Sequence, residues 1–201
     1  MPNVAIETLG CKLNFSESSQ IGQDFSDAGY SLVDFGQDAD IYIINTCSVT
    51  RNANSTCRKT VRKALKQNPH AFVAVIGCYA QLKPDEIAGI DGVDAVLGAN
   101  DKFRLLDLFD DFRKQRDTQI FNSDVNKVAD FHHSFSSDER TRSFLKIQDG
   151  CNYKCSFCTI PLARGKSRSP EIQSLVYNAR QLVEKEFKEI VITGVNAGDF
   201  G

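Results

Sequence analysis

Two stretches of the chain, DIYIINTC at residues 40–47 and AFVAVIGC at residues 71–78, decide the fold. Each is a short apolar run rich in Ile, Val and aromatic residues, which is typical of a strand buried on both faces. NVAIET at residues 3–8 and VDAVL at residues 93–97 have the same character. Helical patterns separate these runs, so the sequence predicts an α/β fold with an open parallel sheet and helices on both faces.

The predicted helices connect these strands in order. Apolar spacing and flanking Gly and Pro residues predict helices over residues 14–29, 50–66 and 101–113, with a shorter helix opening at Pro84. We therefore expect residues 1–115 to form one α/β domain.

A second unit follows a polar stretch. Residues 116–140 lack apolar periodicity and are expected to be a linker. The pattern resumes with FLKIQ at residues 144–148, a helix after Pro170, and EIVIT at residues 189–193. A single β-loop-α-β unit cannot bury a sheet by itself, so we expect the domain at residues 141–201 to be incomplete at its C-terminal end.

Composition excludes several classes of protein. The 201 residues are 41% apolar and carry a net charge of −2, which gives no overall attraction for polyanions. No apolar run approaches the roughly 20 residues of a membrane span, and residues 1–10 lack an export signal. We therefore expect a cytoplasmic protein with no membrane partner. In that reducing compartment, its seven cysteines are expected to bind metal or to react.

The segment CNYKCSFC places Cys151, Cys155 and Cys158 in one loop just after a predicted strand. A loop this short can wrap three corners of a cuboidal iron–sulfur cluster, for which thiolates are the usual ligands. The alternative is zinc, but structural zinc sites normally close with four ligands, and no cysteine or histidine follows Cys158. Three ligands would leave one iron open for chemistry.

Three dispersed cysteines share one context, because Cys11, Cys47 and Cys78 each follow a predicted strand directly. The carboxyl ends of parallel strands line one edge of a sheet, so three loops can deliver three thiols to one place. The alternative is three small buried cysteines, a common fate of free thiols. Cys57 lies inside a predicted helix instead and is expected to be a free thiol.

Four segments resemble the methylthiotransferase family of radical S-adenosylmethionine enzymes: TLGCKLN at 8–14, INTCSVT at 44–50, GCYAQ at 77–81 and FLKIQDGCNYKCSFC at 144–158. The resemblance covers the whole chain. It implies that residues 141–201 begin a partial (β/α) barrel. It also implies that the rest of the barrel and an RNA-binding domain lie outside the 201 residues, so we expect this chain alone to be inactive.

The resemblance also implies the cofactors. In that family one [4Fe–4S] cluster binds S-adenosylmethionine and cleaves it to a 5′-deoxyadenosyl radical. A second [4Fe–4S] cluster supplies sulfur, which is inserted into a C–H bond and then methylated. By this resemblance Cys151, Cys155 and Cys158 bind the first cluster, and Cys11, Cys47 and Cys78 bind the second. Flavodoxin or ferredoxin is the expected electron donor. The residues expected to contact S-adenosylmethionine are Phe157, Gly194, Asn196 and Gly198.

The family divides between tRNA bases beside the anticodon and an aspartate of a ribosomal protein. LGCKLN and GCYAQ resemble the branch that acts on N6-threonylcarbamoyladenosine 37 of tRNA, while the isopentenyladenosine branch typically has Gln-Met-Asn where this chain has Lys12-Leu13-Asn14. The expected partner is therefore the tRNA anticodon stem-loop. The alternatives are isopentenyladenosine 37, the ribosomal aspartate, a non-catalytic iron–sulfur module for electron transfer or sensing, and zinc-dependent nucleic-acid binding.

Basic residues gather in the predicted helix at 50–66. Arg58, Arg62 and Lys66 repeat every four residues and therefore share one helical face. Such a face can contact RNA phosphates, or it can simply be a solvated surface. A second basic run, RGKSRS at 164–169, follows the cysteine triplet and is expected either to hold substrate or to brace the loop.

Overall fold

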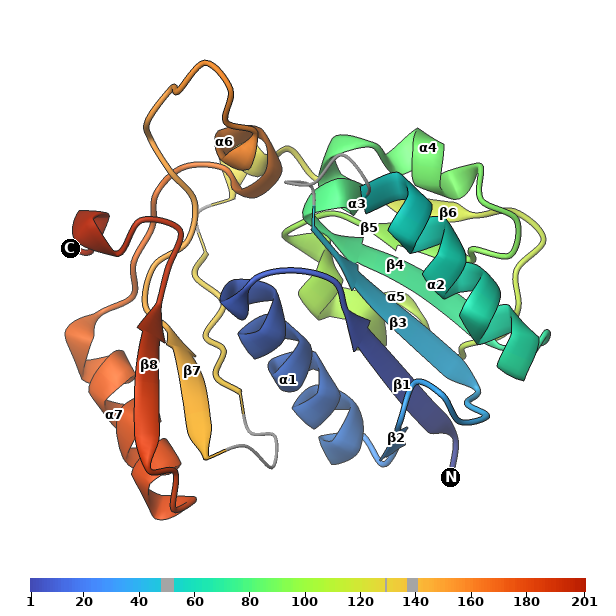
Figure 1. Ribbon diagram of the computed structural model, residues 1–201, viewed down its shortest axis with the longest axis horizontal. Helices are drawn as coiled ribbons and strands as arrows, with labels where there is room; N and C mark the ends of the chain where they lie inside the picture. Colours follow the sequence, from blue (N-terminus) through green and yellow to red (C-terminus); the bar gives the residue numbers. More distant parts are fainter. Residues whose placement is uncertain (48–52, 129, 137–140) are drawn as a thin grey trace.

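A computed structural model describes residues 1–47, 53–128, 130–136 and 141–201 of the chain. Figure 1 shows a larger sheet with helices on both of its faces and a smaller two-stranded unit beside it. All strand pairs are parallel in both sheets. The α/β class predicted from the apolar runs is therefore confirmed.

The larger sheet has the strand order β2-β1-β3-β4-β5-β6. Every residue of the two middle strands, β3 and β4, is buried, which explains why their sequences are continuously apolar and do not alternate. Four of the six strands lie within two residues of the predicted boundaries. The strands are β1 (Asn3–Thr8), β2 (Ser31–Val33), β3 (Ile41–Thr46), β4 (Phe72–Gly77), β5 (Ala95–Leu97) and β6 (Gln119–Phe121).

Each face of this sheet has its own apolar core. Alternate residues of β3 and β4 point to opposite faces, so Tyr42 and Val73 belong to one core while Ile43 and Phe72 belong to the other. The first core is covered by α2 (Ala53–Gln67), α3 (Cys78–Leu82) and α4 (Pro84–Ala88). The second is covered by α1 (Lys12–Asp27), η1 (Asp101–Arg104) and α5 (Leu105–Leu108).

The helix predicted over residues 101–113 is wrong beyond its first turns. It ends at Leu108, and Phe109 is extended with φ −131° and ψ 113°. The rings of Phe109 and Phe112 then lie 4.9 and 5.3 Å from Phe72 on the sheet face. Aromatic packing there outweighs the helical pattern. Asp110 and Asp111 would also lie at the C-terminal end of such a helix, where negative charge is unfavourable.

The stretch 116–140, predicted to be a linker, contains regular structure. Residues Gln119–Phe121 form β6, which pairs with β5 and completes the sheet, and Val125–Lys127 form the 3-10 turn η2. Three-residue strands such as β2 and β6 are too short for their period to be read from sequence. The boundary between the two expected domains stays a prediction.

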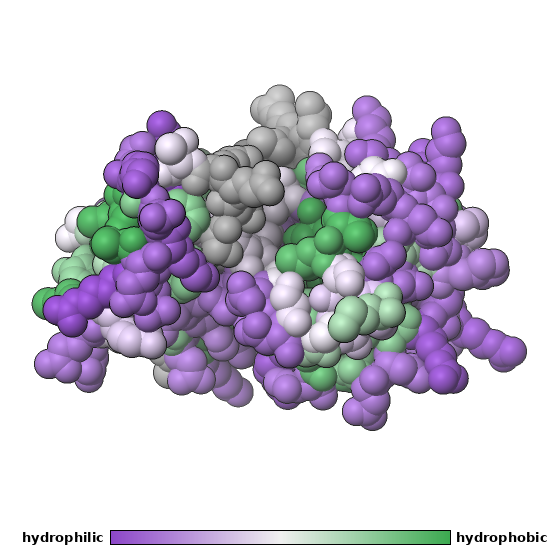
Figure 2. Space-filling view, turned by 90° about the horizontal axis from the view of Figure 1, so that it is seen from below, coloured by the Kyte–Doolittle hydropathy of each residue, from purple (hydrophilic) through white to green (hydrophobic). Residues whose placement is uncertain are grey.

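The smaller unit is a β-loop-α-β arrangement, as predicted. Its elements are β7 (Arg142–Lys146), α6 (Ile160–Arg164), α7 (Ile172–Glu184), β8 (Glu189–Thr193) and the 3-10 turn η3 (Ala197–Asp199). In the view from below, an apolar area appears on the left-hand part of the molecule, where this unit lies (Figure 2). Large apolar side chains such as Ile172, Tyr177 and Ile192 are exposed on α7 and β8, because two strands and one helix offer too little surface to cover them.

The two units meet along α1 and α3, which pack against β7 and α6, respectively. Figure 1 shows α1 between the larger sheet and the β7–β8 pair. Among the described residues, no helix is both long enough and apolar enough to cross a membrane.

Candidate functional site

Cys11, Cys47 and Cys78, the N-terminal cysteine group, lie at the carboxyl edge of the larger sheet. They follow β1, β3 and β4, which are neighbours in that sheet. A Cβ atom placed on Gly10 would lie 2.9 Å from the Cβ of Cys47, so the first two loops touch. The expectation that separate strand ends bring these cysteines to one edge is confirmed, whereas their binding of a cluster stays a prediction.

Gly77 lets the third loop approach the same edge. Its φ is +99°, a left-handed backbone conformation that favours glycine. A Cβ atom there would lie 2.5 Å from Asn45 Oδ1 and 2.6 Å from the Thr46 carbonyl oxygen. Any larger residue would therefore push Cys78 away from β3, and the thiols of Cys47 and Cys78 would separate.

The cysteine loop, residues 151–158, is held by backbone contacts to the segment after α6. The Cys151 N–H donates to the Gly165 carbonyl at 3.0 Å. Gly150 has φ +70°, and a Cβ atom on it would lie only 1.9 Å from the Lys166 carbonyl oxygen. The loop can therefore cross residues 165–168 only with glycine at its base. Within the loop, the Cys158 N–H donates to the Cys155 carbonyl at 3.1 Å.

The donor chemistry of both cysteine groups suits iron–sulfur ligation, because each group offers three thiols on loops at strand ends. Within the described ranges, no three His, Cys, Asp or Glu side chains converge closely enough for a single metal ion. Cys57 is different. It is buried in the core under α2, and burial raises the pKa of its thiol to about 11, as suits an inert packing residue.

Gln148 connects the cysteine loop to the glycine-rich turn after β8, residues 194–198. The buried Gln148 amide donates to the Gly150 carbonyl at 2.8 Å and to Ser167 Oγ at 2.9 Å. Its Oε1 accepts the Asn196 N–H at 2.9 Å. A Cβ atom on Gly194 would lie 3.2 Å from Gln148, so close packing there favours glycine.

Gly198 and Phe157, which were also expected to contact S-adenosylmethionine, are packed less closely against the rest of the protein. A Cβ atom on Gly198 would meet only Asn196 Oδ1, at 3.5 Å. Phe157 is 89% exposed on the cysteine loop. Tyr153 of that loop does reach the turn, since its hydroxyl donates to Asp199 Oδ1 at 3.2 Å. Binding of S-adenosylmethionine by Phe157 and by the glycine-rich turn stays a prediction.

A cavity separates the two cysteine-bearing units. Its volume is about 510 Å³, and the Cys11 loop faces the end of β8 across it. Phe144 of β7 and Phe15 of α1 supply apolar wall. The lining residues from the two sides include Gly10, Cys11, Lys12, Thr193 and Gly194.

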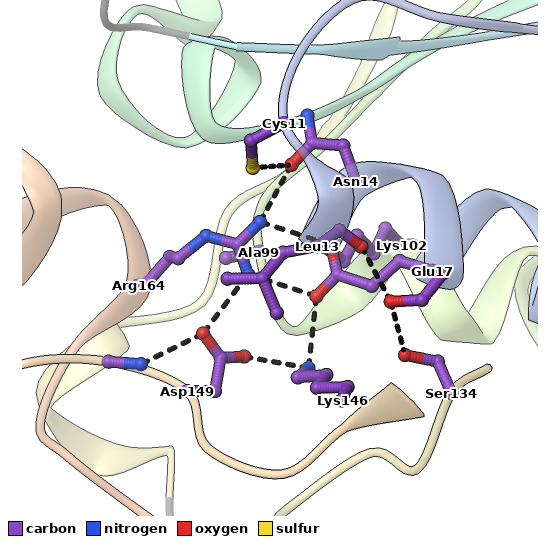
Figure 3. A network of polar contacts seen from close by, with 12 residues as sticks. Cys11, Leu13, Asn14, Glu17, Ala99, Lys102, Ser134, Lys146, Asp149 and Arg164 are labelled. Atoms are coloured by element: carbon purple, nitrogen blue, oxygen red, sulfur yellow. Dashed lines mark hydrogen bonds and ion pairs between the residues drawn. The ribbon is translucent and has the colours of Figure 1, made fainter. Parts of the chain in front are cut away.

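A network of buried charges lies at the junction of the two units (Figure 3). Glu17 of α1 forms ion pairs with Lys102, Lys146 and Arg164, and Asp149 pairs with Lys146 and Arg164 from the other side. All five side chains are at most 4% exposed. Charges buried this deeply persist only when they are paired and hydrogen-bonded.

The electrostatics of this network favour ionised carboxylates. Burial alone raises the pKa of Glu17, but the cations Arg164, Lys102 and Lys146 outweigh it and hold that pKa well below its usual range. Burial also raises the pKa of the Cys78 thiol, while Arg164 and Lys102 act in the opposite direction. The network therefore places cationic charge beside one thiol of the N-terminal cysteine group.

Five residues of this junction were not predicted as site residues from the sequence: Glu17, Lys102, Lys146, Gln148 and Asp149. One signal was available, because Glu17 lies four residues from both Leu13 and Ile21 and therefore on the apolar face of α1. A charged residue at such a position predicts a buried partner. The basic run at 164–169 was expected either to hold substrate or to brace the cysteine loop. Its first residue, Arg164, is buried and bonds Asp149 at the base of that loop, so Arg164 braces the loop.

The predicted basic face of α2 is present in part. Arg62 and Lys66 are exposed, Arg58 is half-buried, and all three line a shallow cavity of about 360 Å³ with residues of the α4 end. Arg51, the first basic residue of that predicted helix, lies outside the described residues.

Comparison with known proteins agrees with this geometry. Residues 3–98 match a family described as "Uncharacterized protein family UPF0004", and residues 145–200 match the "Radical SAM superfamily". Threonylcarbamoyladenosine tRNA methylthiotransferase MtaB of Bacillus subtilis is 43% identical over 205 residues, which cover 100% of this chain and 45% of that protein. The chain belongs to the methylthiotransferase family of radical S-adenosylmethionine proteins.

Two further relatives represent both tRNA branches of this methylthiotransferase family. MtaB of Aquifex aeolicus is 37% identical, with 98% of this chain and 49% of the relative covered. A tRNA-2-methylthio-N(6)-dimethylallyladenosine synthase of Methylacidiphilum infernorum is 34% identical, with 100% and 45% covered. The chain spans about half the length of the curated relatives it matches. Membership of the family implies S-adenosylmethionine and iron–sulfur chemistry.

Proposed function

We propose that this protein is a methylthiotransferase that replaces the hydrogen at C2 of N6-threonylcarbamoyladenosine 37 in tRNA with a methylthio group. The observation that carries the proposal is a cavity of about 510 Å³ between the Cys11 loop and the end of β8, which belongs to the unit that carries the other cysteine loop. A reaction that joins a carbon radical to a sulfur donor needs both partners at one substrate, and a cavity shared by the two units supports such a reaction.

The ligand assignment follows from the donor set. Each cysteine group would hold one [4Fe–4S] cluster through three thiolates, leaving one iron of each cluster open. When bound, such clusters supply reductive cleavage of S-adenosylmethionine and a sulfur atom for transfer, with a flavodoxin or ferredoxin as electron donor. The ligands would be Cys11, Cys47 and Cys78 for one cluster and Cys151, Cys155 and Cys158 for the other.

The chain's own residues hold the cofactor side of the cavity in shape. Gln148 bonds the base of the cysteine loop and the Asn196 backbone at once, so the loop and the glycine-rich turn are kept in register. Phe157, Gly194 and Gly198 would complete the S-adenosylmethionine surface, with Phe157 closing over it from its exposed position. Phe15 and Phe144 give the cavity walls on which a planar base can stack.

RNA as the partner is supported by charge as well as by relatives. Arg62 and Lys66 are exposed on the last turns of α2, the end of the helix that leads into β4. Cations in such a row can contact successive phosphates of an anticodon stem-loop. The proposed location is the cytoplasm, where tRNA and reducing conditions coexist.

Iron analysis tests the ligand assignment. Anaerobic reconstitution of the chain should give about eight irons, and replacing either cysteine group by alanine should leave about four. If the Cys11, Cys47 and Cys78 triple variant still held the full complement, the second cluster would be excluded. Cys57→Ala is the matched control and should leave the iron content unchanged.

Nucleoside analysis of tRNA tests the substrate. Cells that lack the full-length protein should lose 2-methylthio-N6-threonylcarbamoyladenosine and accumulate the form without the methylthio group. A selective loss of 2-methylthio-isopentenyladenosine would instead support the second candidate, the activity for which the 34% identical dimethylallyladenosine synthase is named. Unchanged tRNA together with reversible redox cycling would indicate an electron-transfer or sensor module.

A further inference from the structure

Arg164 lies between the two units that carry the cysteine groups. It ends α6, six residues after Cys158, and its side chain is only 2% exposed. Nη1 donates to Glu17 Oε1 and to Asp149 Oδ1, both at 3.0 Å. Nη2 donates to Asn14 Oδ1 at 2.7 Å and to Glu17 Oε2 at 3.1 Å. The planar guanidinium thus bridges the start of α1 and the base of the cysteine loop.

Through Asn14, Arg164 reaches the backbone beside the N-terminal cysteine group. Asn14 Oδ1 accepts from Arg164 and, in the free protein, also from the Cys11 S–H, with sulfur and oxygen 3.7 Å apart (Figure 3). Asn14 Nδ2 donates to the Thr46 carbonyl at 3.0 Å, directly before Cys47. A Cβ atom on Gly10, directly before Cys11, would lie 2.9 Å from the same Nδ2. The fully buried Asn14 therefore connects Arg164 to the residues that precede two of the three strand-end cysteines, whether or not the Cys11 thiol is ionised.

On its other side, Arg164 reaches the cysteine loop by two routes. Asp149 Oδ1 accepts from Arg164 and also accepts the Gly150 N–H at 2.8 Å, one residue before Cys151. The next residue along the chain, Gly165, accepts the Cys151 N–H at 3.0 Å. The backbone beside each cysteine group consequently lies within two hydrogen bonds of one guanidinium.

We propose that Arg164 is a positioning residue shared by both cysteine sites, which sets the separation and orientation of the N-terminal cysteine group relative to the cysteine loop. This rests on the proposed function in one respect, namely that both groups bind clusters. A purely structural Arg164 would stabilise the junction without affecting how the two sites face each other.

Two variants separate these roles. Arg164→Lys keeps the buried charge but loses the planar fork that reaches Asn14 and Asp149 simultaneously. Asn14→Ser removes the hydrogen bond to Thr46 and the packing against Gly10 while leaving the Glu17 ion pairs in place. Lys114→Gln is the matched control, because it breaks a hydrogen-bonded ion pair with buried Asp94 at the opposite end of the sheet.

The readout is the magnetic interaction between the two reduced clusters, measured by electron paramagnetic resonance on the reconstituted full chain. Both variants should keep the wild-type iron content and show a changed interaction spectrum. Lys114→Gln should lower the melting temperature and leave that spectrum unchanged. The inference is overturned if Arg164→Lys and Asn14→Ser both retain the wild-type spectrum with full iron content.

Failure of the proposed function looks different in the same experiment. If the unaltered chain reconstitutes only one cluster, no inter-cluster interaction exists in any sample, and the two-cluster assignment itself is wrong. Iron content of the unaltered chain therefore distinguishes the two failures. If Arg164→Lys does not fold, Asn14→Ser alone decides the outcome.

Discussion

Glu17→Gln is the sharpest test of how the two units are held together. Glu17 is completely buried and accepts hydrogen bonds from three cations, while Asp149 is the one other carboxylate among the five buried charges of the junction. The substitution keeps the size of the side chain but removes its charge. Lys102, in particular, would lose its ion pair with Glu17 while remaining 1% exposed.

The expected cost follows from this burial. Breaking a buried ion pair by neutralising one partner costs about 3–5 kcal/mol, because the remaining charge stays desolvated. For a protein of this size, about 2–4 °C of melting temperature is lost per kcal/mol, so the expected decrease is roughly 6–20 °C. The assay is thermal unfolding followed by circular dichroism at neutral pH, with urea unfolding as a second measure.

A surface pair provides the matched control for this prediction. Arg142 and Glu189 form an ion pair at 3.2 Å, but their side chains are 57% and 54% exposed. Glu189→Gln should therefore cost only about 0–1 kcal/mol. If Glu17→Gln destabilises the protein no more than this control does, the buried network does not hold the junction, and the reasoning fails.

Three further predictions follow from the same structure. Folding lowers the pKa of Glu17, so the stability that its charge provides is fully present above the unfolded pKa of about 4.3 and is lost as pH falls toward the lower folded pKa. The stabilities of wild type and Glu17→Gln, measured by acid unfolding, should therefore converge below about pH 4. A difference in stability that stays constant with pH would contradict this. Gly150→Ala should abolish iron binding by the cysteine loop while sparing the N-terminal group, since its Cβ would lie 1.9 Å from a backbone oxygen; iron analysis giving wild-type content would refute it. Replacing Arg62 and Lys66 together by glutamine should weaken binding of an anticodon stem-loop, measured by fluorescence anisotropy. The slope of log affinity against log salt concentration should become shallower by about 1–2. An unchanged slope would mean that the α2 face does not contact RNA and is only solvated.

Much of the fold was predictable because it depends on local patterns. The continuous apolar runs of β3 and β4 predicted central parallel strands, and the cysteine after each strand end predicted a common edge. Where the pattern was short or contested, prediction failed. β6 has three residues, and the helix after Asp101 yields to aromatic packing by Phe109 and Phe112.

The sequence by itself determined the alternation of strands and helices, the six cysteines at strand ends and the family, because each of these is written in neighbouring residues. Only the tertiary structure decided that Glu17 pairs with Lys102, Lys146 and Arg164, which lie 85, 129 and 147 residues away. Periodicity reports whether a position is buried, but not which distant charge is buried beside it. That pairing depends on how α1, the larger sheet and the β7–β8 unit dock, and the same docking forms the cavity between the Cys11 loop and the end of β8.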